Sequence, residues 1–252
     1  GLLRDAGLKV GFHVMPNLPA ASMDDDRWMF EELFADERFR PDFLKIYPTL
    51  VTPGTEIEAL WERGDYQPYT EDELIDLVAY AKSLLPEYVR LQRIQRDIPA
   101  RLITAGSRHS NFRQLAGARL REQGGRCRCI RCREAGRSPA PEEAAISTLA
   151  YRACGGEERF IQAGSKDTLI GFARLRFPQQ PFREELTDAA LLRELHVYGS
   201  LVPISAPASP EEWQHRSYGA QLLSRAEEEA RDHGCHRLAV MSGVGVRPYY
   251  RK

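Results

Sequence analysis

The pattern of apolar residues changes near residue 142, and this change constrains the fold of the chain more than any other feature. Before it, short apolar runs at 8–15 and 43–51 alternate with helical patterns at 24–34 and 71–85. Two strands separated by a helix pair in parallel through a right-handed crossover. The first third of the chain therefore predicts part of an α/β sheet or barrel.

Beyond residue 142, strand-like runs follow one another with short polar breaks, a pattern that favours antiparallel hairpins. The expected elements are strands at 146–153, 158–163, 168–177 and 191–198, a helix at 219–233 that ends at Gly234, and a last strand at 236–246. The sequence thus predicts three parts: an α/β domain over 1–90, a linker subdomain over 91–141, and an α+β domain over 142–252.

Composition places the chain among globular proteins, because 42% of its residues are hydrophobic and 28% are charged. No apolar run approaches the ~18 residues that a membrane span requires, so no membrane partner is expected. Five cysteines, an odd number with three of them in six positions, argue against a secreted disulfide scaffold. We expect a protein of the reducing cytoplasm.

Charge is segregated along the chain although the total is only −1. The window 90–133 contains twelve arginines, no lysine and two acids, Asp97 and Glu122, so it carries +10 and the remainder −11. Arginine matches the geometry of phosphate and releases the counterions condensed on nucleic acids. The window predicts a polyanion surface; the alternative is a solvated helical face with no ligand.

Three cysteines, Cys127, Cys129 and Cys132, form the strongest chemical motif. Their thiolates can occupy three corners of a tetrahedral zinc site, with His109, Cys154 or a water as the fourth ligand. An iron–sulfur cluster is the alternative occupant, and three unrelated buried thiols are the alternative without a metal. We expect a structural zinc that holds the arginine-rich linker together.

A second motif, Gln214 to Ala220, lies between a predicted strand and a predicted helix. Backbone N–H groups at the start of a helix can bind a pyrophosphate, although turns of this kind are common without a ligand. Tyr249 and Tyr250 near the end of the chain offer phenols that could donate protons, whereas adjacent tyrosines otherwise serve packing.

Several motifs, in the same order and at similar spacing, make nearly the whole chain resemble the catalytic subunit of Elongator, a family of tRNA wobble-uridine carboxymethylating enzymes. The motifs are GFHVMPNLP at 11–19, LKIYPTLV at 44–51, RIQRDIP at 93–99, the cysteine cluster, RELHVYG at 193–199, the loop 214–219, and SGVGVR at 242–247 followed by YYRK at 249–252.

The resemblance implies that 1–90 is the C-terminal part of a radical S-adenosylmethionine (SAM) TIM-like barrel, 91–141 a basic zinc-binding linker, and 142–252 a GNAT acetyltransferase domain that is incomplete at its C-terminus. It also implies a role for particular residues. Acetyl-CoA would be bound by Glu194, Leu195, His196 and Val197 at the pantetheine arm, by Gln214, Tyr218, Gly219, Ala220 and Gln221 at the pyrophosphate, and by Tyr250 near the thioester, where Tyr250 and Tyr249 would be catalytic. The tRNA anticodon arm would contact Arg93, Arg96, Arg101, Arg108 and Arg113.

The reaction implied by the resemblance adds a carboxymethyl group from acetyl-CoA to C5 of uridine 34 by radical SAM chemistry, with SAM and a [4Fe–4S] cluster as cofactors. Two departures stand out: Ser217 replaces a glycine of the general GNAT loop, and the cluster cysteines at CxxxCxxC spacing are absent from this sequence. We therefore expect a fragment without radical activity of its own.

Two other functions stay open at this stage. One is a protein-lysine acetyltransferase, although a lysine-rich acceptor would favour an acidic entrance over an arginine-rich one. The other is a non-catalytic tRNA-binding module with acetyl-CoA as a structural ligand. Expected partners are tRNA and acetyl-CoA, with a homodimer or accessory Elongator subunits as further candidates.

Overall fold

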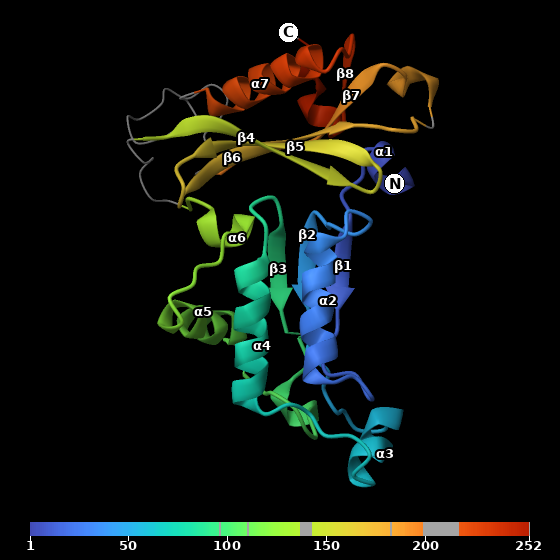
Figure 1. Ribbon diagram of the computed structural model, residues 1–252, viewed down its shortest axis with the longest axis vertical. Helices are drawn as coiled ribbons and strands as arrows, with labels where there is room; N and C mark the ends of the chain where they lie inside the picture. The colour runs from blue at the N-terminus through green and yellow to red at the C-terminus, as the bar shows by residue number, and fades with distance from the viewer. Residues whose placement is uncertain (96, 110, 137–142, 182, 199–216, 252) are drawn as a thin grey trace. The chain divides into compact units, whose positions relative to one another are not determined.

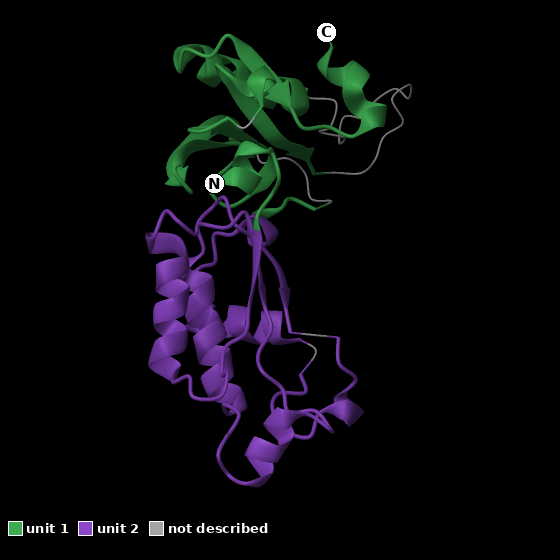
Figure 2. Ribbon diagram, turned by 90° about the vertical axis from the view of Figure 1, so that its right-hand side faces the viewer, with its two compact units in different colours: residues 1–10, 133–252 green, residues 11–132 purple. Residues whose placement is uncertain are grey.

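The computed structural model (Figure 1) describes residues 1–95, 97–109, 111–136, 143–181, 183–198 and 217–251. The chain divides into two compact units (Figure 2). The parallel-sheet unit spans Gly11–Cys132, and the mixed-sheet unit combines Gly1–Val10 with Arg133–Lys252. The domain boundaries near 90 and 141 that the sequence favours remain predictions, and two of the residues singled out above, Arg96 and Gln214, lie outside the described part.

The parallel-sheet unit is built on three strands in the order β1-β2-β3: β1 (Gly11–Val14), β2 (Phe43–Ile46) and β3 (Arg90–Ile94). Both strand pairs are parallel, as the strand–helix–strand pattern predicts. The other elements of this unit are α2 (Met23–Ala35), α3 (Glu56–Glu62), α4 (Glu71–Leu84), η1 (Ala100–Leu102), α5 (Phe112–Glu122) and α6 (Ile130–Arg133), whose last residue begins the other unit.

Capping fixes where the long helices of this unit begin. At α4, the Thr70 hydroxyl accepts a hydrogen bond from the Glu73 backbone N–H at 3.3 Å, and the Glu73 carboxylate accepts one from the Thr70 N–H at 2.8 Å. Ser22 and Asp25 form the same reciprocal box at α2. Each box satisfies two N–H groups that a helix start leaves without a partner. The apolar faces that follow carry buried Phe30 on α2 and buried Leu77 on α4.

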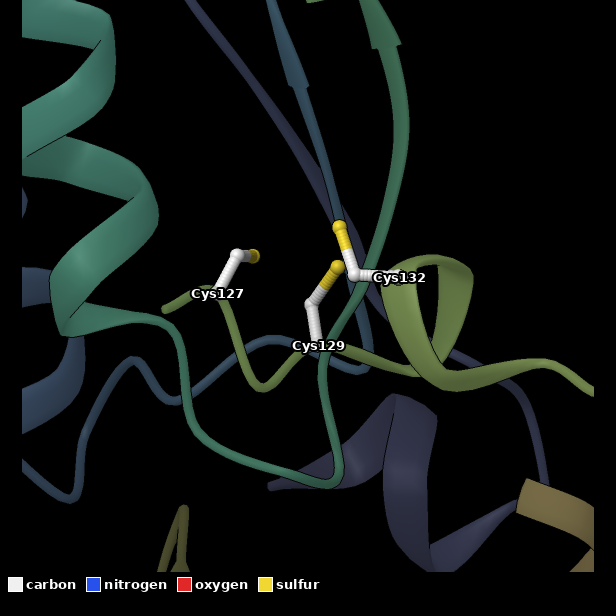
Figure 3. A group of neighbouring side chains, drawn as sticks. All are labelled: Cys127, Cys129 and Cys132. Atoms are coloured by element: carbon white, nitrogen blue, oxygen red, sulfur yellow. The ribbon is translucent and has the colours of Figure 1, made fainter. Parts of the chain in front are cut away.

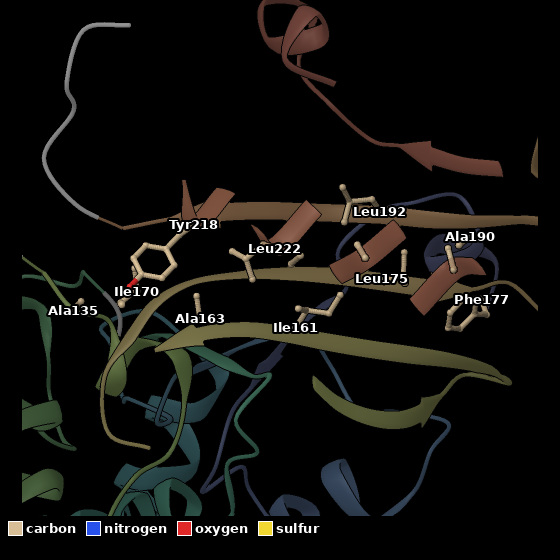
Figure 4. Close-up of a cluster of buried hydrophobic side chains, with 13 residues drawn as sticks. Ala135, Ile161, Ala163, Ile170, Leu175, Phe177, Ala190, Leu192, Tyr218 and Leu222 are labelled. Carbon is tan, nitrogen blue, oxygen red and sulfur yellow. The ribbon is translucent and has the colours of Figure 1, made fainter. Parts of the chain in front are cut away.

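The mixed-sheet unit contains five strands in sequence order: β4 (Ala145–Ala153), β5 (Gly156–Gly164), β6 (Leu169–Phe177), β7 (Ala189–Val197) and β8 (Arg237–Val240). The first four pair antiparallel and β7 pairs parallel with β8. One face packs against α7 (Tyr218–Asp232) through a core that includes Ile161, Leu175, Leu192 and Leu222 (Figure 4). Its short elements are α1 (Leu2–Asp5), η2 (Glu184–Leu186), η4 (Val244–Val246) and α8 (Arg247–Tyr250).

The fold class expected from the sequence is confirmed, while several strand limits differ. The strand expected at 236–246 ends at Val240, because the chain then turns through Gly243 into η4 and α8. The strand expected at 43–51 ends at Ile46, two residues before Pro48, which has no N–H for a ladder. β3 was not expected, because its sequence RLQRI holds only two apolar residues.

Buried charges tie the first residues of the chain to the mixed sheet. Glu158 on β5 is fully buried and accepts hydrogen bonds from Arg4 at 2.9 Å, Arg176 at 3.0 Å and Arg193 at 2.8 Å. Arg176 also donates to Asp5 at 2.6 Å. Burial of charges is tolerated only where each finds a partner. The helix α1 is therefore an integral part of this unit.

Candidate functional site

The cysteine loop, residues 127–132, gathers three thiols in one place (Figure 3). Their sulfur atoms all lie within 4.8 Å of one another, and within the described residues this is the only group of metal-binding side chains of its kind. Cys127 and Cys129 are buried and Cys132 is more exposed. The loop is anchored by the Ile130 N–H, which donates to the carbonyl of Val89 at 2.9 Å, just before β3.

The electrostatics of the cysteine loop suit a metal ion. Hydrogen bonds from the Cys127 and Cys132 thiols hold the pKa of Cys129 far below its ordinary value, to about 2. Hydrogen bonding to Cys129, followed by burial, raises the pKa of Cys127. The three sulfurs thus share protons that a divalent cation would displace, and three convergent thiolates are a zinc donor set.

Neither residue considered as a fourth ligand joins this group. His109 instead lies within 2.9 Å of the Glu71 carboxylate through its Nε2 and packs edge-on against Phe112. Cys154 belongs to the turn between β4 and β5 in the other unit, where its backbone φ is 51°. Among the described residues, the loop supplies three ligands, so the fourth position is available to a water or another donor.

Among the described residues, one strand edge of the mixed-sheet unit is open along part of its length. β8 pairs with Ala189–Leu192 only, so the second half of β7, from Glu194 to Val197, has no partner from β8 on that side, while β6 pairs with the other. Backbone groups on such an edge can bond an extended ligand. The resemblance assigns Glu194–Val197 to the pantetheine arm. These four residues form the part of β7 that β8 leaves uncovered.

The side chain of Glu194 is fixed by two cations at the start of this edge. It accepts hydrogen bonds from Arg174 Nε and from Lys9 Nζ, each at 3.0 Å. Burial opposes its ionisation, but the two cations outweigh that effect and hold the pKa of Glu194 below its ordinary value. His196 packs edge-on against Tyr198, with ring centroids 4.5 Å apart.

The start of α7 and the two tyrosines meet at this edge. A Cβ added to Gly219 would lie 2.7 Å from the Tyr249 hydroxyl and 3.7 Å from Val197, so a larger residue there would displace the hydroxyl. Tyr250 packs against the α7 core, and burial raises its pKa and that of Tyr249. Tyr218 is buried in the same core, with its ring labelled in Figure 4. Ser217 adopts φ 55°, a left-handed conformation that glycine prefers.

The four described arginines among those assigned to tRNA differ in what they contact. Arg93 pairs with Asp97, while Arg108 and Arg113 donate to the carbonyls of Ile103 and Leu91 at 2.8 and 2.9 Å. Arg93 and Arg108 border one cleft of about 470 Å³ beyond the end of β3, together with Ile94, Gln95, Asp97, Ile98 and Ala100. Arg101, on η1 beside them, is exposed.

Other arginines of the basic window are neutralised by acids of α4 and its neighbourhood. Arg119 pairs with Asp72 and Asp76, and Arg128 pairs with Glu87. The formal charge of +10 therefore overstates the free cationic surface.

Sequence reasoning missed Lys82, which is only 3% exposed and borders the cysteine loop. Its signal was available: Lys82 follows Leu74 and Val78 at intervals of four, so a lysine occupies a core position of an amphipathic helix.

Comparison with known proteins agrees with the fold. Residues 41–122 match the model of the radical SAM C-terminal domain, and residues 129–252 match the acetyltransferase (GNAT) family. The fold and the site thus define a chain that joins part of a radical SAM domain to a GNAT domain.

Individual relatives specify the family. The chain is 44% identical to a tRNA uridine(34) acetyltransferase of Methanocaldococcus jannaschii and 45% identical to Elongator complex protein 3 of Danio rerio, each over its full length. It covers 48% and 47% of those proteins, about half their length. The structure of archaeal Methanocaldococcus infernus Elp3 with an N-terminal deletion superimposes with a TM-score of 0.90 at 43% identity, over 99% of this chain and 61% of that one. The chain belongs to the Elongator complex protein 3 family.

Proposed function

We propose that this chain forms the acetyl-CoA-binding and RNA-binding part of an enzyme that modifies uridine 34 of tRNA at C5 to a carboxymethyl group. The observation that carries the proposal is the open edge of Glu194–Val197, which lies beside Gly219 and Tyr249 in a GNAT-type sheet. The named activity of the relatives supports uridine 34 as the target. The proposed cell compartment is the cytoplasm.

The residues of the mixed-sheet unit have distinct proposed roles. The backbone of Glu194–Val197 binds the pantetheine arm of acetyl-CoA as an added strand, while backbone N–H groups at the start of α7, from Tyr218 to Gln221, bind the pyrophosphate. The Tyr250 hydroxyl donates a proton at the thioester, and Tyr249 holds the adjoining surface against Gly219. A tyrosine hydroxyl keeps its proton at neutral pH, and burial raises the pKa of Tyr250 further.

The parallel-sheet unit has a proposed role in binding tRNA. Cationic groups lie beyond the C-terminal end of β3. They belong to Arg101 and to the cleft that Arg93 and Arg108 border. Because the strands are parallel, the other strands end at the same edge of the sheet. A zinc ion on Cys127, Cys129 and Cys132 would hold the following loop in place. The resemblance to a radical SAM domain also implies SAM and a [4Fe–4S] cluster, which together supply a carbon-centred radical when bound. The CxCxxC triad does not match the family's cluster motif, so these three cysteines would not hold the cluster.

Hydrolysis of acetyl-CoA tests the proposal. The intact protein is expected to hydrolyse acetyl-CoA slowly and to do so faster when tRNA is present. Tyr250→Phe removes the hydroxyl and keeps the ring, and the rate with tRNA should fall about 100-fold, the typical contribution of a general acid. Tyr151→Phe, on β4 outside this edge, is the matched control. Unchanged hydrolysis in Tyr250→Phe would refute the role of that hydroxyl.

Binding of tRNA is tested separately by a titration in rising salt. The logarithm of affinity should fall linearly with the logarithm of salt concentration, by roughly 0.7–0.9 for each phosphate contact. Binding that ignores salt would contradict an arginine-based RNA surface, and acetylation of a lysine peptide in place of tRNA-stimulated hydrolysis would favour a protein acetyltransferase.

A further inference from the structure

A second cleft, which the proposed function does not use, lies next to the cysteine loop in the parallel-sheet unit. Its volume is about 270 Å³. It is lined by Lys82 from α4, by Gly117, Leu120 and Arg121 from α5, and by Gly125, Arg126, Cys127 and Cys132. None of these lining residues is acidic, so three cations border one small space.

Lys82 is the unusual member of this cleft. Its side chain is only 3% exposed, and within the described residues it makes no hydrogen bond or ion pair; the group it influences electrostatically is the thiol of Cys132. An ammonium group buried without an anion is strongly unfavourable, and buried lysines are therefore normally paired. We therefore expect a negatively charged group to bind beside the Lys82 ammonium in this cleft.

Gly117 shows where that partner would lie. A Cβ at this position would be 3.5 Å from Lys82 Nζ and 3.7 Å from Arg121 Nη1, so the two cationic groups border the same space above the glycine. Arg121 is exposed, and the described residues give it no ion pair. The absent side chain leaves room for a group in contact with both cations.

The net charge of the cleft shows whether a metal ion on the three cysteines is sufficient or whether an anion must bind as well. Three thiolates with one divalent ion carry a single net negative charge. Lys82, Arg121 and Arg126 together carry three positive charges, so two remain after the metal centre is counted. A phosphate group, tetrahedral and carrying one or two negative charges, matches this remainder and the donors that lysine and arginine present.

We propose that this cleft is a phosphate-binding site, in which Lys82 and Arg121 hold a phosphate group beside the cysteine loop. Its assignment to the RNA backbone rests on the proposed function. Binding of a free phosphate would have the same chemistry without RNA, and the experiment below separates the two sources.

Two variants of the intact protein test the site without unfolding it. Lys82→Met removes the ammonium and keeps a flexible apolar chain of similar length in the buried position. Gly117→Ala places a methyl group between the two cations, and because alanine favours a helix more than glycine does, it should raise stability. Gln114→Ala, exposed on the same helix, is the matched control.

Three quantities are measured for each protein: the affinity for an anticodon stem-loop RNA in rising salt, the binding of inorganic phosphate by ³¹P NMR, and the zinc content. Lys82→Met and Gly117→Ala should each weaken RNA binding about tenfold, the effect of one charge-assisted hydrogen bond. The slope of log affinity against log salt should flatten by roughly 0.7–0.9. Zinc content and the Gln114→Ala control should match the wild type.

The outcomes separate the two proposals. Loss of phosphate binding in both variants, with RNA binding unchanged, supports the site and assigns it to a free phosphate. Wild-type binding of both RNA and phosphate by the two variants overturns it, and so does loss of zinc in Lys82→Met, because the lysine would then serve the metal centre. If wild-type protein binds phosphate at this cleft but no RNA, the proposed function fails while the site stands.

Discussion

Replacing Glu158 by glutamine should destabilise the mixed-sheet unit strongly. The change keeps the size of the side chain and removes one negative charge. Glu158 is the shared partner of Arg4, Arg176 and Arg193, and none of these four side chains is measurably exposed. After the change, Arg176 keeps its ion pair with the carboxylate of Asp5.

The magnitude follows from the number of cations left behind. Breaking a buried ion pair by removing one partner costs about 3–5 kcal/mol, because the remaining charge stays buried without compensation. Three arginines converge on Glu158, so we expect the upper part of that range. With a urea dependence of about 2 kcal/mol per molar, the unfolding midpoint should fall by roughly 2 M.

Hydrogen exchange in rising urea measures this change where it occurs. Peptides from β5 and β6 should lose protection at a lower urea concentration in Glu158→Gln, whereas peptides from α4 report on the other unit. Glu185→Gln is the control, since its pair with Arg183 is exposed. A midpoint for β5 and β6 that moves no more in Glu158→Gln than in the control would refute the argument that this carboxylate compensates three buried cations.

Three further predictions concern the sites. Lys9 and Arg174 lower the pKa of Glu194, so its contribution to stability should be full above the unfolded value and lost as pH falls through the lowered one; Lys9→Met should raise that pKa in an NMR titration, and an unchanged value would be inconsistent with the ion pair. Gly219→Ala should displace the Tyr249 hydroxyl and lower tRNA-stimulated acetyl-CoA hydrolysis by at least about tenfold at unchanged melting temperature, since ~1 Å of misplacement can cost 100-fold. Cys129→Ser should weaken zinc binding more than about 100-fold in a chelator competition, and full retention of zinc would exclude this triad as the metal site.

Periodicity and capping account for most of the fold that could be predicted. The helical pattern at 71–85 predicts α4, and Thr70 and Glu73 form both hydrogen bonds of the capping box at its start. Alternation of strands with helices gave the parallel pairing, and successive strand runs gave the antiparallel meander. These signals depend on residues that are close in sequence, so they can be recognised without knowing what each element packs against.

Features that depend on distant partners could not be predicted. β3 is a strand because Arg90 and Leu91 pair with β2, although two of its five residues are arginines. Arg119 pairs with acids of α4 that lie more than forty residues earlier in the sequence. The sequence alone therefore does not show that the positive charge of Arg119 is neutralised. The cysteine triad was visible because its members are close in sequence, whereas the role of Lys82 depends on α5 and the loop beside it.

The division of the chain has a consequence for biosynthesis. Arg4 and its partner Glu158 are 154 positions apart, with the entire parallel-sheet unit between them. At about 5–20 residues per second, a ribosome needs roughly 8–30 s to travel that distance. During this interval α1 has no partner for its buried charges, whereas the parallel-sheet unit can already fold. The mixed-sheet unit can fold only after β5 has been synthesised.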